Sequence, residues 1–405
     1  MSLRLNKNID WSEALLNNNH SVFPKEWAIY CFQDVGSFKT GKDYKSVQGP
    51  THPVYGSSSA PMAVRTSIPI YTKDSFIIGR KGTIDKPFYV KGPFWCVDTA
   101  MYFEHDASKS DIRFLYYSAK TIPWMKYNSG STIPSLTQSL ANSLAIVLPP
   151  LAEQTAIANI LSDQEALIAQ YDNLIALHEK RFAYLSDELL SGRLRLNVDG
   201  IASSNENWQM VSVNGDLVEI PADWETKKLG QTLTCLDSKR KPLNSKERAS
   251  QKGLVPYWGA NSIVDFVSGY LLDEDVVLLG EDAAPFFDKS KRVAFASHGK
   301  IWPNNHVHVL KPKDIDFSYA VYVLNQLPYE QIIGVTVRPK LTQSRMLDID
   351  LVMPSRLEQA LIAQVLSDQE ALIAQYKKLR DAEKKRFDWL SDALLSGTYR
   401  VKVEA

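Results

Sequence analysis

The chain has 405 residues, of which 44% are hydrophobic and 23% are charged, and 46 lysines and arginines balance 46 aspartates and glutamates. This length exceeds that of an ordinary single domain, so at least two hydrophobic cores are expected. No stretch approaches the ~18 consecutive apolar residues that span a membrane, and residues 1–8 are not followed by the apolar segment of a secretory signal. We therefore expect a cytoplasmic protein without membrane contact.

The first segment, residues 1–148, contains short apolar runs bounded by turn residues, such as 75–79 and 87–90, which are typical of β-strands. Lysine and arginine outnumber aspartate and glutamate here by 16 to 11. Basic and polar loop residues of this kind contact the phosphates or base edges of nucleic acids. The candidates in this segment are Tyr55, Ser57, Arg65, Arg80, Lys81, Lys86 and Lys91.

The second segment, residues 149–204, predicts a long helix followed by a linker. Positions that step by alternating four and three residues are mostly apolar, which is the heptad pattern of a coiled coil. Prolines precede this run and Gly192 follows it, as expected for the ends of a helix, and the rod would be roughly 50 Å long. The expected seam, which Gln164 and His178 interrupt, consists of Ile157, Leu161, Ile168, Tyr171, Phe182, Leu185 and Leu189.

The third segment, residues 205–353, again predicts mostly strands, but its 17 basic residues face 19 acidic ones. Much of any affinity for a polyanion would then have to come from a basic partner. The candidate contact residues in this segment are Lys239, Arg240, Lys241, Tyr257, Trp258, Asn261, Lys289, Lys291, Arg292, Lys300 and Arg338.

Two patterns in the third segment imitate metal chemistry. His306 and His308 alternate onto one face of a predicted strand, but no cysteine or carboxylate motif accompanies them. Asp223 and Glu225 imitate the carboxylates of a nuclease, yet they lie in a Pro-x-x-Trp element. The sequence also has no phosphate-binding Gly-x-x-x-x-Gly-Lys loop and no dinucleotide-binding turn. We therefore expect no metal site, no cofactor and no catalytic residue.

An internal repeat organises the whole chain. The segment LSDQEALIAQY occurs at residues 161–171 and again at 366–376, an offset of 205 residues. Weaker matches at the same offset pair residues 134–139 with 339–344. The fourth segment, 354–405, therefore predicts a second copy of the helix, with its seam at Ile362, Leu366, Ile373, Tyr376, Phe387, Leu390 and Leu394. The fold class that follows is α+β, with two repeated globular units separated by a long antiparallel coiled-coil helix pair.

This arrangement resembles the specificity subunits of type I restriction-modification systems over essentially the whole chain. Each unit opens with Pro-x-x-Trp, at residues 24–27 and 221–224, and each helix ends in Leu-Leu-Ser-Gly, at 189–192 and 394–397. Each unit closes with Pro-x-Leu and then a proline followed by Glu-Gln and Ile-Ala, at residues 134–158 and 339–363. Residues 79–84 are also similar to a strand and turn of the family's recognition domain, whereas the corresponding residues 280–283 depart from it.

The resemblance implies two target-recognition domains, residues 1–148 and 205–353, joined by the conserved regions 149–204 and 354–405. Each domain would read one half of an asymmetric bipartite DNA site. The implied partners are double-stranded DNA, two methyltransferase subunits and, through the complex, the restriction subunits. The chain itself would be non-catalytic.

Two alternatives remain open. A coiled-coil adaptor that binds proteins is the first, because a net charge of zero is unusual for a protein that neutralises phosphates. A nuclease that uses the region around Asp223 is the second.

Overall fold

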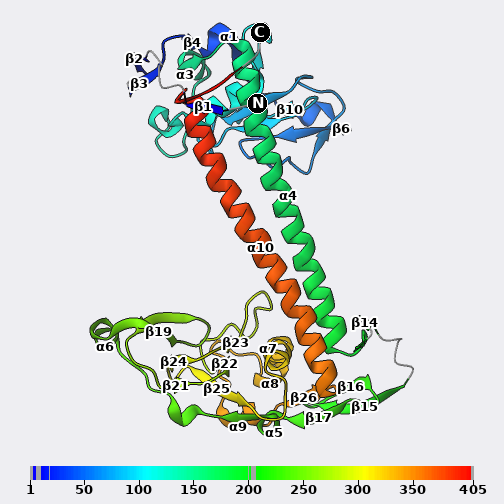
Figure 1. Cartoon of the computed structure of the whole chain (residues 1–405). Coiled ribbons are helices and arrows are strands. Elements are labelled where there is room, and N and C mark those ends of the chain that lie inside the picture. Colours follow the sequence, from blue (N-terminus) through cyan, green and yellow to red (C-terminus); the bar gives the residue numbers. More distant parts are fainter. Residues whose placement is uncertain (1–2, 6–10, 18, 199, 202–206, 403–405) are drawn as a thin grey trace. The chain divides into compact units, whose positions relative to one another are not determined.

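The computed structural model describes residues 3–5, 11–17, 19–198, 200–201 and 207–402. Two compact units emerge: unit 1 combines residues 1–173 with 377–405, and unit 2 is the continuous stretch 174–376. Helices α4 (Leu151–Leu190) and α10 (Arg356–Leu395) each contribute one half to each unit (Figure 1). Unit 1 is therefore built from both ends of the chain.

Unit 1 contains a four-stranded antiparallel sheet in the order β5-β11-β8-β9. Strand β8 is buried on both faces, and the rings of Phe32, Phe38 and Phe103 meet beneath the sheet with centroids 4.9 to 5.4 Å apart. The elements of this unit are β1 (Leu3–Leu5), β2 (Trp11–Leu16), β3 (Asn19–Pro24), β4 (Ala28–Cys31), α1 (Phe32–Val35), β5 (Gly36–Thr40), η1 (Lys45–Val47), β6 (Gln48–Tyr55), β7 (Arg65–Thr66), β8 (Ser75–Gly79), β9 (Phe88–Val90), β10 (Trp95–Cys96), β11 (Ala100–His105), α2 (Ile112–Thr121), η2 (Trp124–Tyr127), α3 (Gln138–Ser143), β12 (Ala145–Leu148) and β27 (Tyr399–Val401).

Unit 2 repeats this sheet in the order β18-β25-β22-β23, with β22 buried throughout. A second four-stranded sheet, β20-β19-β24-β21, extends it. The elements are β13 (Leu196–Asn197), β14 (Gly200–Ile201), β15 (Trp208–Val213), β16 (Asp216–Pro221), β17 (Glu225–Lys228), α5 (Leu229–Thr232), β18 (Leu233–Cys235), η3 (Asp237–Lys239), α6 (Ser245–Ser250), β19 (Lys252–Trp258), β20 (Ile263–Val267), β21 (Leu272–Asp273), β22 (Val276–Gly280), β23 (Ala294–Ser297), β24 (Lys300–Pro303), β25 (Val307–Pro312), α7 (Phe317–Gln326), α8 (Tyr329–Ile333), α9 (Gln343–Leu347) and β26 (Asp350–Met353).

The two long helices pack against each other in antiparallel fashion within each unit. In unit 1, Ile157 and Leu161 of α4 join Leu390 and Leu394 of α10 in one core, and in unit 2 the end of α4 likewise meets the start of α10. Of the expected seam residues, Ile157, Leu161, Leu189, Ile362, Leu366, Ile373, Leu390 and Leu394 are buried. The others, Ile168, Tyr171, Phe182, Leu185, Tyr376 and Phe387, are half-buried.

Polar pairs interrupt the seam at matched positions in the two units. In unit 1, Nε2 of Gln164 donates to Glu383 at 2.5 Å. In unit 2, the amide nitrogen of Gln369 lies 2.7 Å from Nδ1 of His178, whose ring stacks on Tyr376. The two glutamines are equivalent in the repeat, and so are Glu383 and His178. Buried polar pairs of this kind favour one helix register over others.

The Leu-Leu-Ser-Gly motifs at the helix ends contact the Pro-x-x-Trp motifs near the start of each repeat. Gly192 has φ +77° and packs against Pro221 and Trp224 in unit 2, and Gly397 has φ +75° and packs in the same way against Pro24 and Trp27 in unit 1. A Cβ atom at Gly192 would lie only 2.5 Å from the proline ring. The Leu-Leu-Ser-Gly and Pro-x-x-Trp motifs therefore recur because they form one contact.

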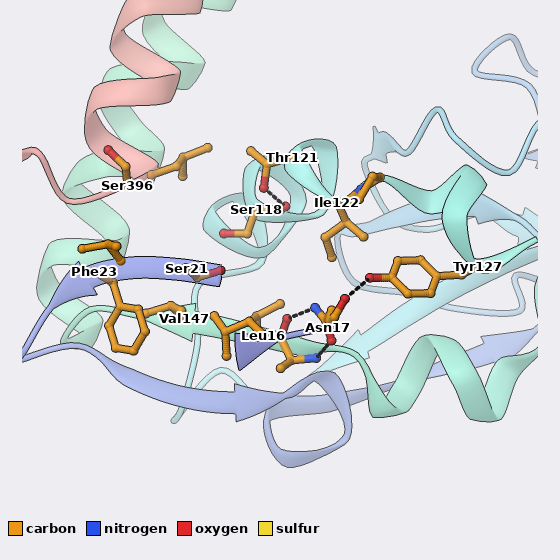
Figure 2. A pocket seen from close by; sticks show the side chains of 15 residues that line it. Leu16, Asn17, Ser21, Phe23, Ser118, Thr121, Ile122, Tyr127, Val147 and Ser396 are labelled. Carbon is orange, nitrogen blue, oxygen red and sulfur yellow. Dashed lines mark hydrogen bonds between the residues drawn. The ribbon is translucent and has the colours of Figure 1, made fainter. Parts of the chain in front are cut away.

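Each unit also opens with a β-hairpin that the sequence alone did not predict as a repeat. The hairpins β2-β3 and β15-β16 turn at Asn17 and Asn214, which both have positive φ. The Asn17 side chain brackets the backbone of Ala145 with two hydrogen bonds of 2.8 Å (Figure 2), and Asn214 brackets Asp350 in the same way. A surface pocket of about 330 Å³ lies beside the first hairpin, and one of about 240 Å³ lies at the same place in unit 2.

Candidate nucleic-acid interface

Two adjacent cationic candidates, Arg80 and Lys81, lie in the turn that follows β8 in unit 1. Gly79 allows the backbone to pass Thr83 at a distance that no Cβ atom would fit, and Gly82 adopts φ +86°. The backbone N–H groups of Arg80 and Lys81 both donate to the carbonyl of Thr99, at 2.8 and 3.0 Å. Two glycines and these bonds therefore hold two adjacent cationic side chains at the edge of the sheet.

Arg80 and Lys81 line a surface pocket of about 320 Å³. The remaining lining residues are mostly hydroxyl or amide residues: Thr40, Ser129, Ser135, Leu136, Thr137 and Gln138. Lys81 is exposed, and the Arg80 guanidinium donates only to the carbonyl of Asp98, at 3.1 Å, in the described part of the chain. Two cations beside several hydroxyl groups form a surface that suits a phosphate or a base edge.

The equivalent turn of unit 2, after β22, carries Glu281 and Asp282 in place of these cations. Each carboxylate already has partners: Arg240 lies 2.5 Å from Glu281, His306 lies 2.5 Å from Asp282, and Lys340 reaches Glu281 at 3.1 Å. Arg240 also bonds to the carbonyl of Val307 and is mostly buried. Arg240 thus neutralises this turn, and contact of Arg240 with DNA stays a prediction beside this structural role.

Comparison with known proteins identifies the framework that carries these two turns. The profile of the type I restriction modification DNA specificity domain matches residues 24–181 and, a second time, residues 221–382. The chain belongs to this specificity family. The two matches together cover most of the chain, and they fall on the two copies of the repeat.

Individual relatives agree with this family. A specificity subunit of a type I restriction enzyme from Methanocaldococcus jannaschii is 24% identical over 92% of this chain and 95% of that protein. A Haemophilus influenzae protein provisionally named as such a subunit is 31% identical, over 37% of this chain and 38% of its own length. The crystal structure of the type I restriction-modification S subunit from M. genitalium aligns over 99% of both chains with a TM-score of 0.67, and at 17% identity it supports the fold.

Two aromatic candidates of this specificity-family chain lie in the core. Tyr257 is 2% exposed and accepts a hydrogen bond from the backbone N–H of Leu243 at 2.9 Å. Trp258 is 9% exposed and packs on Phe295. Successive side chains of β19 point to opposite faces, and both are buried because each face is covered: Tyr257 lies in a hydrophobic cluster with Leu243, and Trp258 lies in another with Leu278. Contact of these two side chains with DNA stays a prediction that their burial does not favour.

The other candidates of unit 1 divide by accessibility. Lys86, Lys91 and Arg65 are exposed, although Arg65 also bonds to the carbonyl of Thr51 at 2.7 Å. Ser57 lies beside the turn at Gly82, and Tyr55 is half-buried against Phe88 and Phe94. Of these five side chains, the exposed cations Arg65, Lys86 and Lys91 are the ones accessible to a nucleic acid.

The remaining candidates of unit 2 are exposed, but several have partners within the chain. Arg292 pairs with Glu370, Lys291 pairs with Asp288 at 3.1 Å, and Lys300 lies over the ring of Tyr270. The side chain of Asn261 contacts Ser262. Among the described residues, no hydrogen bond or ion pair is found for the side chains of Lys239, Lys241, Lys289 and Arg338. Lys340, which the sequence analysis missed, lies beside the acidic turn.

The two patterns that imitate metal chemistry are parts of ion-pair networks. His308 is fully buried, with Nδ1 2.6 Å from Asp237 and Nε2 2.8 Å from the carbonyl of Leu341. Asp237, Glu281 and His308 do gather within 4.8 Å, a grouping that the sequence did not predict. Both ring nitrogens are occupied, however, and Arg240 lies against both carboxylates. The cluster is therefore explained by hydrogen bonding and ion pairing.

Asp237 and Glu281 are held in the ionised form by this network. Burial alone would raise the pKa of Asp237, but hydrogen bonds from His308 and the Val309 backbone, with the charge of Arg240, lower it overall. The pKa of Glu281 is lowered in the same way, against its burial, by Arg240 and Lys340. The negative charge of Glu281 in this turn is thus neutralised by cationic side chains of the same unit.

The carboxylates around Asp223 also have structural partners. Arg195 donates to both oxygens of Asp223, at 2.9 and 2.8 Å, and Glu225 lies 2.7 Å from Lys227.

In the part of the chain that the structure describes, no helix is both long enough and apolar enough to cross a membrane.

Proposed function

We propose that this chain is the DNA-reading subunit of a type I restriction-modification complex and that it reads an asymmetric bipartite site. One observation carries the proposal: the framework repeats, while the chemistry at one matched turn diverges. The turn after β8 presents Arg80 and Lys81, and the turn after β22 presents Glu281 and Asp282, which are neutralised. Two different reading surfaces on one repeated scaffold suit two different half-sites.

The domain boundaries follow from the same reasoning. Residues 1–148 and 205–353 act as the target-recognition domains, and residues 149–204 and 354–405 act as the conserved regions. Partners are double-stranded DNA, two methyltransferase subunits and the restriction subunits of the complex. The partners supply the chemistry and the cofactors, and the complex works in the cytoplasm.

Two copies of the methyltransferase subunit are part of the proposal because the repeated framework offers matched surfaces twice. The hairpins, the Gly192 and Gly397 contacts and the two pockets beside the hairpins recur in both units. A repeated surface suits a repeated partner.

The test is to co-express the chain with its methyltransferase and to map the methylated bases in the host genome. We expect a split, asymmetric motif that disappears when the gene for this chain is deleted. A motif that persists without the chain contradicts the proposal. If the chain instead assembles proteins and has no influence on methylation, it is a coiled-coil adaptor.

A further inference from the structure

In each unit, a short loop lies next to the turn that follows β8 or β22. The residues at the two ends of the loop are hydrogen-bonded, whereas most of the residues between them are exposed. We define tip loop 2 as residues 334–338 and tip loop 1 as its counterpart in the repeat, residues 129–133. Each loop directly precedes a matched Pro-x-Leu-Thr-Gln motif, at 134–138 and 339–343. The role that we propose for these two loops rests on the proposed function.

The base of tip loop 2 is hydrogen-bonded to neighbouring elements on both sides. Before the loop, the N–H of Gly334 donates to Glu330, and Arg345 donates to the carbonyl of Ile333 at 3.0 Å. After the loop, the N–H of Leu341 donates to Glu281 at 2.7 Å, and the carbonyl of Leu341 accepts from the buried His308 at 2.8 Å. Helices α8 and α9 therefore hold the start of the loop, and the turn at Glu281 with the buried His308 holds its end.

The tip of this loop has no comparable packing. Val335 is 85% exposed and Val337 is 98% exposed. Arg338 is exposed as well, and its side chain forms no ion pair or hydrogen bond with any residue that the structure describes. Two apolar side chains and one free guanidinium contribute nothing to the core of unit 2, so their chemistry is available to a ligand.

Tip loop 1 has a similar base and a different tip. Oδ1 of Asn128 accepts from the N–H groups of Gly130 and Ser135, at 2.9 and 2.8 Å, and Leu136 donates to the carbonyl of Arg80 as Leu341 does to Glu281. Ser129 and Ser135 line the pocket of Arg80 and Lys81, which places this loop at the basic turn. At the repeat offset none of the five tip residues, Ser-Gly-Ser-Thr-Ile against Gly-Val-Thr-Val-Arg, is identical.

We propose that the two tip loops are specificity-determining elements, each contacting the bases of one half-site. In the two copies of the repeat, both loops are anchored at matched positions and their tips differ, which suits a reading element because position is kept while chemistry changes. In tip loop 2, the guanidinium of Arg338 suits the two acceptors of guanine, and the valine side chains suit the methyl group of thymine. Tip loop 1 offers hydroxyl groups and Ile133, which is 59% exposed, beside two cations.

The experiment uses the full chain assembled with its methyltransferase, and the readout is the methylated motif together with the rate at each sequence. The variants are Arg338→Ala and the double change Val335→Ser with Val337→Ser. Because these side chains have little or no contact with the described residues, we expect both variants to fold and assemble. Removal of Arg338 should lower methylation of the original motif about tenfold and relax one position in a single half-site.

Matched controls are Lys313→Ala and Leu254→Ser, an exposed cation and a 92% exposed apolar residue of the same unit outside the loop. Both controls should keep the motif and its rate. A second variant replaces residues 334–338 with the five residues of tip loop 1, and it should alter the same half-site while leaving the other half unchanged.

Unchanged rate and unchanged discrimination in the assembled loop variants would overturn the proposal. Loss of assembly in Arg338→Ala would overturn it too, since the loop would then lie at a protein interface. A change in both half-sites would contradict the assignment of one loop to one half. Failure of the proposed function looks different, because the wild-type chain itself would then have no influence on the motif.

Discussion

Arg195 donates to both carboxylate oxygens of Glu358, at 2.7 and 2.8 Å, and its guanidinium lies over the ring of Trp224 at 5.3 Å. In unit 1, Arg400 and Glu153 repeat the pair at 2.6 and 2.7 Å, and the guanidinium lies over Trp27. The four residues occupy matched positions at the repeat offset of 205. In each unit, the arginine of the Arg–Glu pair thus covers the tryptophan of the Pro-x-x-Trp motif.

The first prediction concerns the stability of unit 2. Arg195→Met should lower the free energy of unfolding by about 3 kcal/mol, because it leaves the carboxylate of Glu358, 5% exposed, without its partner. Arg193→Met, which removes the ion pairs of an exposed guanidinium with Asp187 and Glu188, should cost less than about 1 kcal/mol. Urea unfolding followed by tryptophan fluorescence measures both. Equal costs for the two variants would contradict a special role for Arg195.

The second prediction concerns pH. Because the pKa of Asp237 is lower in the folded state, its ionised form stabilises the fold at pH values above its unfolded pKa of about 3.9. That contribution is lost as the pH falls through the folded pKa. Asp237→Asn should therefore lower the unfolding temperature of unit 2 at pH 7, and the difference from wild type should shrink below about pH 4. Asp275→Asn, at an exposed carboxylate, serves as the control and should show little effect at either pH.

The third prediction concerns the polar pair of the helix seam in unit 2. Gln369→Leu alone should destabilise the protein by about 1 to 2 kcal/mol, because it leaves the half-buried Nδ1 of His178 without its partner. The double change with His178→Leu should recover that loss, since both polar groups are then replaced together. A double-mutant cycle measured by urea unfolding gives the coupling energy. Additive effects of the two changes would show that the pair does not act as a unit.

The fourth prediction concerns DNA affinity and depends on the proposed function. Arg80→Gln should weaken binding of the assembled complex and reduce the slope of log affinity against log salt by about 0.9 if the guanidinium contacts one phosphate. Lys81→Gln should have a similar effect. Lys109, which bonds to the carbonyl of Asp34, provides the control substitution Lys109→Gln. An unchanged salt slope in both turn variants would remove this turn from the phosphate contacts.

The fifth prediction concerns the gap between the half-sites, which we attribute to the length of the helix pair. One heptad inserted after Tyr171 and another after Tyr376 would keep the seam in register and add about 10 Å. At ~3.4 Å per base pair, the gap should grow by about three base pairs. Some activity should be lost, because three base pairs rotate the distant half-site by roughly 100°. An insertion in one helix alone should disrupt assembly, whereas an active double variant with the original gap would exclude the helices as the spacer.

The family and the α+β class were predicted from sequence and are confirmed, because an exact repeat and a heptad pattern are local signals. The hairpins at Asn17 and Asn214 were missed as a repeat although they share the 197-residue offset of the Pro-x-x-Trp motifs, because residues 11–24 and 208–221 are identical at only three positions. The partner of Arg240 could not be predicted either, because Glu281 lies 41 residues away in the chain. Only the folded sheet brings such charges together.

The candidate site shows the same limit. In β19, Tyr257 and Trp258 are buried whereas Leu254 is 92% exposed, so composition does not reveal which side chains are buried. Lys81 was identified because it lies in a dense basic run, whereas Lys340 is isolated in the sequence and becomes part of the turn only through the bridge to Asp282. Exposure and pairing are tertiary properties.

The pairing of β1 with β27 has a consequence for synthesis of the chain on the ribosome. Unit 2 is continuous and is complete once residue 376 has emerged, but unit 1 needs Gly397 against Trp27 and Arg400 against Glu153. The unit that is translated first is therefore the last to close. Until residues 397–400 have been translated, Pro24 and Trp27 lack the partners that cover them in the finished fold, and these hydrophobic side chains stay exposed on the nascent protein after unit 2 is complete.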